Sequence, residues 1–372
     1  MAVETMDVAG ENRAHTRYTV RTATGASRLF LLLAALAVVA LALAPLFVDR
    51  SGLQDLFVIL TLLVLAQSWN LLAGYAGLVS VGQQAFVGLG AYAMFAGVIL
   101  LGWGPLPAIL LGGVAALLLA IPTAFFVFRL AGAYFAIATW VIAEVVRLLV
   151  AQWKVLGGGT GTSLPNRDVK DMRGIDWIRS ALDVKGSHAV DIATYWLALL
   201  LAVVTVAVVY RFLRSKRGLG LAALRDNVAA ARSVGVDATR IKATVYLATA
   251  FLTGITGALI YVQTARISPD AAFSVIDWTA YVIFIVVIGG IGTIEGPILG
   301  VLVFFLLRNA LADYGTWYLI TLGALGIAVM LFAPRGLWGL VADRTGLQLF
   351  PVRRRLSGPG VTDATKPGGT NG

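Results

Sequence analysis

Long apolar runs constrain this chain more than any other feature of its sequence. Most of them are close to the roughly 20 residues that cross about 30 Å of hydrocarbon as a helix. Apolar residues make up 59% of the chain and charged residues 13%, against about 45–50% and 25% in soluble domains. The sequence therefore predicts an all-α polytopic membrane protein with about ten transmembrane helices. The runs cover residues 28–48, 55–72, 82–101, 106–128, 132–151, 192–213, 241–264, 278–291, 296–312 and 315–333.

The two ends of the chain are polar. Residues 1–27 carry Arg13, Arg17 and Arg21 among Thr, Ala and Gly without apolar periodicity, which predicts a disordered tail. Residues 334–372 are basic and finish in Gly, Pro and Thr, which predicts a second, mostly disordered tail. The membrane domain between them, residues 28–333, contains a long polar loop at 152–191 and a basic segment at 214–240.

The positions of the basic residues predict the orientation of the chain. Residues 211–242 hold eight Lys or Arg against Asp226 and Asp237, and both tails are basic as well. Ten spans place these three regions on one side of the membrane, and the positive-inside rule assigns that side to the cytoplasm. The loop 152–191 then faces outward. The net charge of +10 thus reflects membrane orientation rather than nucleic-acid binding.

Residues 74–92 combine five glycines with polar side chains between two apolar runs. Glycine lets backbones approach closely or leave helical geometry. Hydroxyls and carboxamides satisfy freed backbone groups, or a polar solute, where bulk water is absent. The stretch is therefore a candidate translocation path, with Tyr75, Ser80, Gln83 and Gln84 as its candidate lining residues. Tight helix–helix contacts are the alternative interpretation.

A second glycine-rich stretch begins at Gly290-Ile-Gly-Thr293 and weakly resembles the first. Transporters are often built from repeated halves with the site between them. Chance similarity between glycine-rich apolar sequences is the alternative.

The basic segment contains a pattern typical of a short amphipathic helix over residues 221–233. Gly235 suits the position after such a helix, and Asp237 suits the N-cap of the next one. The helix either rests on the lipid surface or docks a soluble partner. Its apolar positions at helical spacing are Leu221, Leu224, Val228 and Ala231.

Glu144 and Arg147 are three residues apart inside an apolar run, so they share a helix face and are predicted to form an intramembrane ion pair. Ionisable residues inside a bilayer are functional candidates. The alternative is a structural pair in which Arg147 extends toward the outer end of the span.

Several residue patterns that catalysis requires are missing from the sequence. The chain has no Cys, and His15 and His188 both lie in polar segments. A metal site and a Ser/His/acid set are therefore not expected. No Gly-x-x-x-x-Gly-Lys-Ser/Thr motif occurs, so any ATP must be hydrolysed by another chain. The sequence predicts a transport subunit rather than an enzyme.

Six motifs together resemble the M-type permease subunit of branched-chain amino acid ABC importers, in one order over residues ~55–333. The resemblance implies the ABC importer permease fold. The motifs are Asn70-Leu-Leu-Ala-Gly74-Tyr75-Ala-Gly77-Leu-Val-Ser80-Val-Gly82-Gln83-Gln84-Ala85-Phe86, Gly132-Ala-Tyr134-Phe135-Ala-Ile-Ala-Thr139, Glu144-Val-Val-Arg147, Gly158-Gly159-Thr160-Gly161, Leu224-Arg225-Asp226-Asn227 before Gly235, and Gly289-Gly290-Ile-Gly292-Thr293-Ile-Glu295-Gly296-Pro297.

By this resemblance, residues 221–235 would form the coupling helix that contacts a cytoplasmic ATPase. Such permeases show a Glu-Ala-Ala pattern there, whereas this chain has Ala229-Ala230-Ala231, which leaves a salt bridge from that position in doubt. The implied coupling residues are Leu224, Arg225, Asp226, Asn227, Ala230, Arg232 and Gly235.

The resemblance also implies partners. These are a second homologous permease, two cytoplasmic ATP-binding subunits, and an external substrate-binding protein that contacts the loop 152–191. ATP and Mg would be used by the partner ATPases, and this chain would bind no cofactor.

The implied function is import of branched-chain amino acids across a bacterial inner membrane, with both termini in the cytoplasm. A permease of the same family for urea or short amides is one alternative. An ion-coupled secondary transporter is another, although Glu144 is the only acidic residue well inside a predicted span.

Overall fold

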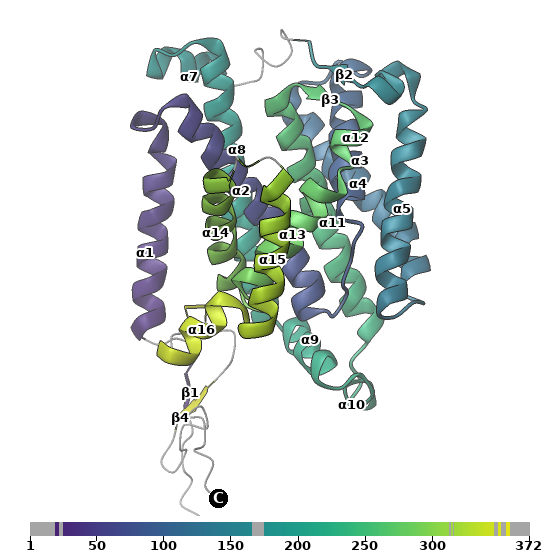
Figure 1. The fold of residues 1–372 in the computed structure, drawn as a ribbon, viewed down its shortest axis with the longest axis vertical. Helices are drawn as coiled ribbons and strands as arrows, with labels where there is room; N and C mark the ends of the chain where they lie inside the picture. The colour runs from purple at the N-terminus through teal and green to yellow at the C-terminus, as the bar shows by residue number, and fades with distance from the viewer. Residues whose placement is uncertain are drawn as a thin grey trace, which may run out of the picture.

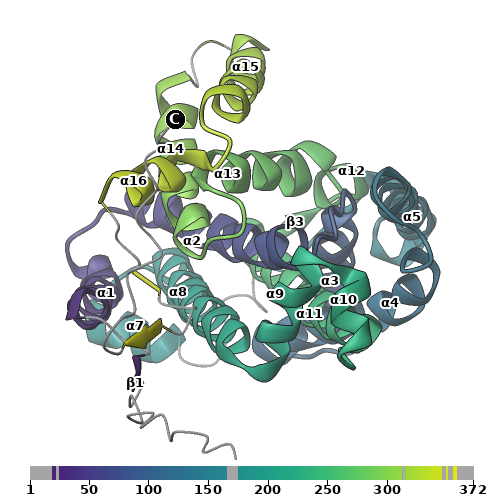
Figure 2. The same ribbon diagram turned by 90° about the horizontal axis from the view of Figure 1, so that it is seen from below.

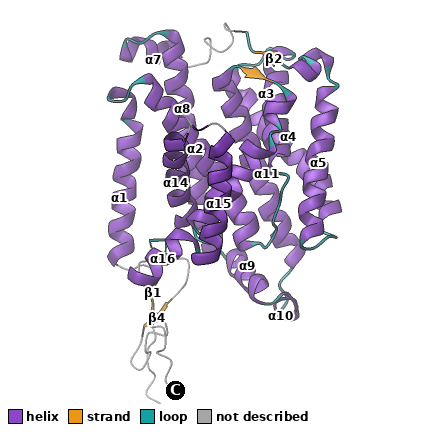
Figure 3. Cartoon of the chain, in the orientation of Figure 1, coloured by secondary structure: helices purple, strands orange, loops and turns teal. Residues whose placement is uncertain are grey.

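A computed structural model describes residues 19–21, 25–165, 175–311, 314, 316–345, 349–350 and 355–357. Its long helices run roughly side by side as one bundle (Figure 1), and helix dominates the described chain (Figure 3). Seven helical stretches within these residues are long and apolar enough to cross a membrane. The predicted all-α polytopic fold is confirmed. The seven are Arg50–Tyr75, Pro105–Val127, Ala133–Ala151, Gly186–Arg214, Ala238–Thr264, Pro269–Gly289 and Leu319–Thr345.

The first half of the bundle follows the predicted apolar runs closely. The carboxylate of Asp49 accepts a hydrogen bond from the Gly52 amide at 3.3 Å and caps α2, and Pro105 occupies the first turn of α4, where its missing N–H costs nothing. The helices are α1 (Gly25–Ala42), η1 (Ala44–Leu46), α2 (Arg50–Asn70), η2 (Leu71–Tyr75), α3 (Gln83–Ile99), α4 (Pro105–Val127) and α5 (Ala133–Ala151).

The second half contains four of the seven long stretches together with shorter helices. The apolar helices α1, α3 and α14 match the remaining predicted runs, so ten spans are consistent with the structure. The helices are η3 (Lys154–Leu156), η4 (Gly158–Thr160), α7 (Ile175–Leu182), α8 (Gly186–Arg214), α9 (Lys216–Asp226), α10 (Val228–Ser233), α11 (Ala238–Thr264), α12 (Pro269–Ala272), η5 (Ile276–Ala280), α13 (Tyr281–Gly289), α14 (Glu295–Leu311), α15 (Thr316–Phe332) and α16 (Gly336–Thr345).

Two small antiparallel strand pairs mark opposite ends of the bundle (Figure 1). β1 (Thr19–Arg21) pairs with β4 (Arg355–Ser357) at the end that also carries α9 and α10, called here the α9 end. β2 (Thr162–Ser163) pairs with β3 (Arg266–Ile267) at the other end, which also carries α7 and is called the α7 end. The two polar segments 152–191 and 214–240 therefore lie at opposite ends.

Glycines bring α3, α4 and α11 into backbone contact. A Cβ atom added to Gly90 would collide with the carbonyl of Gly254, and one added to Gly112 would collide with the carbonyl of Gly90. Inside a bilayer the hydrophobic effect does not drive helices together, so helices associate through close packing, which small residues permit. Seen from below, these helices form one side of the bundle (Figure 2).

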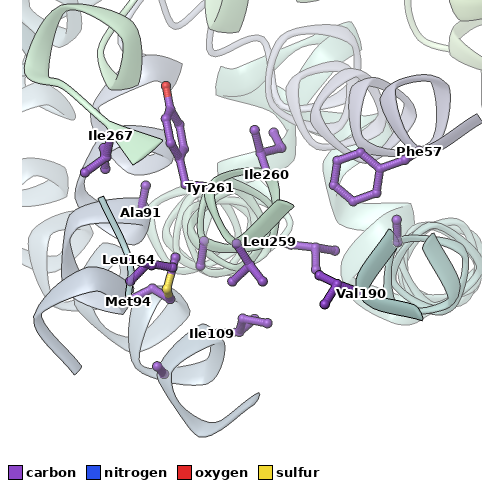
Figure 4. Packing of buried hydrophobic residues seen from close by; sticks show 14 of the residues in the cluster. Phe57, Ala91, Met94, Ile109, Leu164, Val190, Leu259, Ile260, Tyr261 and Ile267 are labelled. Carbon is purple, nitrogen blue, oxygen red and sulfur yellow. The ribbon is translucent and has the colours of Figure 1, made fainter. Parts of the chain in front are cut away.

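Apolar side chains from α2, α3, α4, α8 and α11 fill the bundle toward the α7 end (Figure 4). Phe57, Met94, Ile109 and Leu259 belong to this cluster and are buried. By contrast, α1 and α15 expose rows of Leu, Ile and Val, as expected for helices that face lipid.

The predicted single helix over residues 221–233 is wrong. Asn227 has φ −157° and ψ 110°, which ends α9, and its side-chain carbonyl accepts a hydrogen bond from the Ala230 amide at 3.0 Å. Asn competes with helical backbone bonds in this way and favours N-caps. The predicted cap of the following helix is present, since Asp237 accepts from the Arg240 amide at 3.0 Å.

Two other elements differ from the sequence-based expectation. The span predicted at 278–291 begins earlier, at Pro269, and includes a break after Ala272 and a π-helical turn before α13. Part of each predicted disordered tail is ordered, because Gly336–Thr345 forms α16 and the strands β1 and β4 pair. Within those tails, residues 1–18, 22–24, 346–348, 351–354 and 358–372 lie outside the described residues.

Candidate functional site

The backbone between α2 and α3 leaves helical geometry in a segment whose Leu78 and Ser80 are buried and whose Gly77 and Val79 are exposed. Gly77 has φ +68°, in the left-handed region that favours glycine. The freed backbone groups find partners: the Trp69 indole N–H donates to the Ser80 carbonyl at 2.8 Å, and the Val81 amide donates to Thr139 Oγ1 at 3.1 Å. Irregular backbone at membrane depth requires such internal partners.

Three of the four predicted path residues lie in this irregular segment or directly after it and are buried. Ser80, Gln83 and Gln84 are each about 1% exposed. Gln83 Nε2 donates to Thr253 Oγ1 on α11 at 2.7 Å, and Thr279 Oγ1 on η5 donates to Gln84 Oε1. The start of α3 is thereby joined to two elements that lie far away in sequence.

Some buried acceptors in this region have no partner among the described residues. The side-chain oxygens of Gln67 and Gln83 are both buried and unpaired there. Buried polar atoms are normally hydrogen-bonded, so each of these two oxygens is free to accept a hydrogen bond from water or from a polar solute. Both atoms are acceptors, which suit a donor such as an ammonium or amide N–H.

The end of α2 is joined to the turn between α13 and α14. Asn70 Oδ1 accepts from the Gly292 amide at 2.8 Å, and Asn70 Nδ2 donates to the Thr293 carbonyl at 2.7 Å. A Cβ atom on Gly74 would lie 2.6 Å from the Gly292 nitrogen. The two glycine-rich stretches that resemble each other in sequence therefore contact each other directly.

Arg225 of α9 reaches the same turn. A Cβ atom on Gly292 would lie 2.8 Å from Arg225 Nη1, so the guanidinium rests against the turn that Asn70 holds. Helix α9 also contacts η2, which ends at the half-buried Tyr75. The predicted coupling segment thus contacts η2, which contains Gly74 and Tyr75 of the predicted path, while its Arg225 lies against the neighbouring turn at Gly292.

The other predicted coupling residues divide between buried and exposed positions. Leu224 is buried against Ala231 and Ala238. The side chain of Asp226 lies outside the described residues. The exposed positions, which surround the α9–α10 break and α10, are Asn227, Ala230, Arg232 and Gly235.

The predicted ion pair on α5 is present and has an additional member. Arg147 Nη2 lies 2.6 Å from Glu144 Oε1, and Arg147 Nη1 lies 2.7 Å from Asp270 Oδ1 on α12. The Glu144 side chain is 45% exposed. The group therefore connects α5 to α12 near the α7 end and is separate from the buried carboxamides.

Sequence reasoning missed Gln67, Asn70, Thr253, Thr279 and Asp270. Gln67 and Asn70 are polar residues at the end of an apolar run, and polar residues in such a position indicate a candidate functional site. Thr253 and Thr279 carry no such indication, because threonines in spans commonly bond to their own helix. Among the described residues, no group of three or more His, Asp or Glu side chains has the arrangement of a metal site.

Membrane-length helices around an irregular, polar-lined segment define an integral membrane protein of the solute-permease class. The sequence profile of the family described as "Branched-chain amino acid transport system / permease component" matches residues 53–334. The chain belongs to this family, which confirms the resemblance seen in its motifs.

Two relatives share the name "High-affinity branched-chain amino acid transport system permease protein LivM". The protein from Salmonella typhimurium is 32% identical over 322 residues, which cover 82% of this chain and 74% of the relative. The protein from Escherichia coli is 32% identical over 325 residues, with the same two shares. No solved structure shows a significant match.

Proposed function

We propose that this chain is a permease subunit of an ATP-driven importer of branched-chain amino acids, and that its path passes Tyr75, Ser80, Gln83 and Gln84. The observation that supports the proposal best is the irregular segment at 76–82, whose backbone is hydrogen-bonded internally at Ser80 and Val81 while a neighbouring Gln83 oxygen is left unpaired. Such an acceptor suits the ammonium of an amino acid. The family membership favours this function over an ion-coupled secondary transporter.

The proposed assembly contains a second homologous permease, two ATP-binding subunits that use ATP and Mg, and an external substrate-binding protein. The α9 end, with its basic segment and both strand-paired tails, faces the cytoplasm of a bacterial cell. The α7 end, with the loop 152–191, faces outward and contacts the binding protein.

Movement of the ATPase subunits would act on the coupling residues of α9 and α10. Arg225 lies against the turn at Gly292, and Asn70 links that turn to the end of α2. A displacement of α9 would therefore be transmitted through a few direct contacts to η2 and to the segment 76–82. Transport requires two conformations with different exposure of the path, and burial of Gln83 and Gln84 corresponds to a closed one.

The test is uptake of radiolabelled leucine into proteoliposomes that contain the full assembly. Uptake should require ATP and should stop when the Walker lysine of the partner ATPase is replaced. Gln83→Leu keeps the volume but removes the polar atoms, and we expect uptake to fall about tenfold or more, equivalent to about 1.4 kcal/mol. Thr321→Val, an exposed position on α15, is the matched control.

Persistence of leucine uptake with the inactive ATPase would refute the ATP-driven function. Competition by excess urea or acetamide, without competition by isoleucine or valine, would instead assign the chain to short amides.

A further inference from the structure

Two adjacent hollows lie at the α9 end, where α8 and α11 meet α9. The larger, of about 620 Å³, lies between α9, the turn before α11 and the first turns of α11; the smaller lies against the last turns of α8. Lys216 and Arg217 line both. The three helices contact one another and are adjacent when the bundle is seen from below (Figure 2).

The hollows carry positive charge that nearby carboxylates do not neutralise. Arg240 is paired with Asp237 at 3.0 Å. Arg211, Lys216 and Arg217 are exposed, and no carboxylate in the described part of the chain forms an ion pair with them. Three uncompensated cations thus surround a concave surface where two long apolar helices end.

An apolar strip leads from the membrane-spanning part of α8 to these cations. Leu200, Val204 and Val208 are spaced by four residues, so they lie on one helix face, and all three are exposed. Val208 lines the smaller hollow together with Arg211 and Phe212. Apolar surface of the kind that contacts acyl chains therefore continues into a cationic site at the end of a membrane-length helix.

We propose that the hollows bind an anionic glycerophospholipid, with its phosphate at Lys216 and Arg217 and an acyl chain along the Leu200–Val208 strip. Basic hollows between spans on the cytoplasmic side are suited to anionic headgroups. The start of α9 adds the positive end of a helix dipole, because α9 begins at Lys216, where the Ser215 hydroxyl caps the helix by accepting a hydrogen bond from the Gly218 amide. The cations attract any phosphate, but only a lipid also uses the apolar strip.

The experiment measures the affinity of the purified full chain, in neutral detergent, for fluorescently labelled phosphatidylglycerol and phosphatidylcholine. Phosphatidylglycerol should bind more tightly, and its affinity should fall as ionic strength rises. Lys216→Gln with Arg217→Gln should weaken phosphatidylglycerol binding about 25-fold, since each basic residue near an anionic lipid surface contributes about fivefold.

Two control variants separate this site from general charge and from misfolding. Arg129→Gln with Arg344→Gln removes two cations outside both hollows and should leave affinity within twofold of the unaltered chain. Lys216→Arg with Arg217→Lys keeps both charges and should retain binding.

Three results would overturn the proposal. The first is equal affinity for the two lipids, and the second is equal weakening of phosphatidylglycerol binding by the two double variants that remove charge. The third is displacement of the labelled phosphatidylglycerol by inorganic phosphate at concentrations too low for phosphate to act by ionic screening of the charges. The last result would identify a free-anion site. None of these results depends on transport, so they leave the proposed function to its own test.

Discussion

At the scale of single residues, Asn70 connects two backbone segments that are 222 residues apart in sequence. Replacement by Leu keeps a similar volume but leaves the Gly292 amide and the Thr293 carbonyl without this partner. An unpaired group costs about 1–3 kcal/mol when it is fully buried, and these two groups are half-buried, so we expect Asn70→Leu to lower the free energy of unfolding by about 2 kcal/mol in total. Thermal unfolding in detergent measures the change.

Asn70→Asp gives an independent check on this interpretation, because its carboxylate keeps the acceptor for Gly292 but sets a negatively charged oxygen against the Thr293 carbonyl at a fully buried position. Its unfolding temperature should fall at least as far as that of Asn70→Leu. Equal unfolding temperatures for all three proteins would show that the two hydrogen bonds do not contribute to stability.

The ion pairs of Arg147 offer a second test at this scale. Asp270 is 83% exposed, and exposed ion pairs typically contribute about 0–1 kcal/mol. A double-mutant cycle of Arg147→Gln and Asp270→Asn should therefore give a coupling energy no larger than about 1 kcal/mol in thermal unfolding. A coupling of 3 kcal/mol would mean that this contact, rather than core packing, holds α12 against α5.

The sequence was sufficient to predict the interactions of residues that are close together in it. Glu144 and Arg147 pair as their spacing indicates, and Asp237 caps α11 as predicted. Burial of Ser80, Gln83 and Gln84 agrees with the expectation of an internal polar stretch. Their partners were not predictable, because Thr253 and Thr279 meet them only through tertiary packing.

At the scale of elements, the contact of α3 with α11 depends on Gly90. Gly90→Ala would place a methyl group against the Gly254 carbonyl, and such overpacking typically costs about 1–3 kcal/mol. Gly323→Ala is the matched control, since nothing lies within 4 Å of the added Cβ and Ala favours a helix by up to about 1 kcal/mol. We expect only Gly90→Ala to lower the unfolding temperature.

Apolar runs predicted the existence of the helices well because each run is long and strongly biased in composition. Breaks inside a pattern were harder to predict. The helical spacing of Leu221, Leu224, Val228 and Ala231 continues across Asn227, yet Asn227 adopts an extended conformation and caps α10. The spacing of the apolar residues does not reveal this break, because the break depends on one polar residue whose side chain replaces a backbone hydrogen bond.

At the scale of the whole molecule, the orientation in the membrane can be tested directly. The chain contains no Cys, so single cysteines introduced at exposed Ser233 on α10 and exposed Ser180 on α7 report one end each. In cells whose outer membrane is permeabilised and whose inner membrane is intact, a membrane-impermeant maleimide should label Ser180→Cys. The same reagent should label Ser233→Cys only after the inner membrane is lysed. The reverse pattern would contradict the proposed cytoplasmic position of the α9 end.

Helix α1 is anchored at both of its ends by residues from later in the chain. Near its C-terminal end, Tyr195 donates to the Leu41 carbonyl at 2.6 Å and Trp196 donates to the Ala42 carbonyl at 3.0 Å. Near its N-terminal end, the ring of Phe350 meets that of Phe30 at 5.2 Å, and β4 pairs with β1. The anchors at the two ends of α1 therefore come from different parts of the chain, and truncation before Phe350 would keep the hydrogen bonds from α8 but leave the N-terminal end of α1 loosely attached.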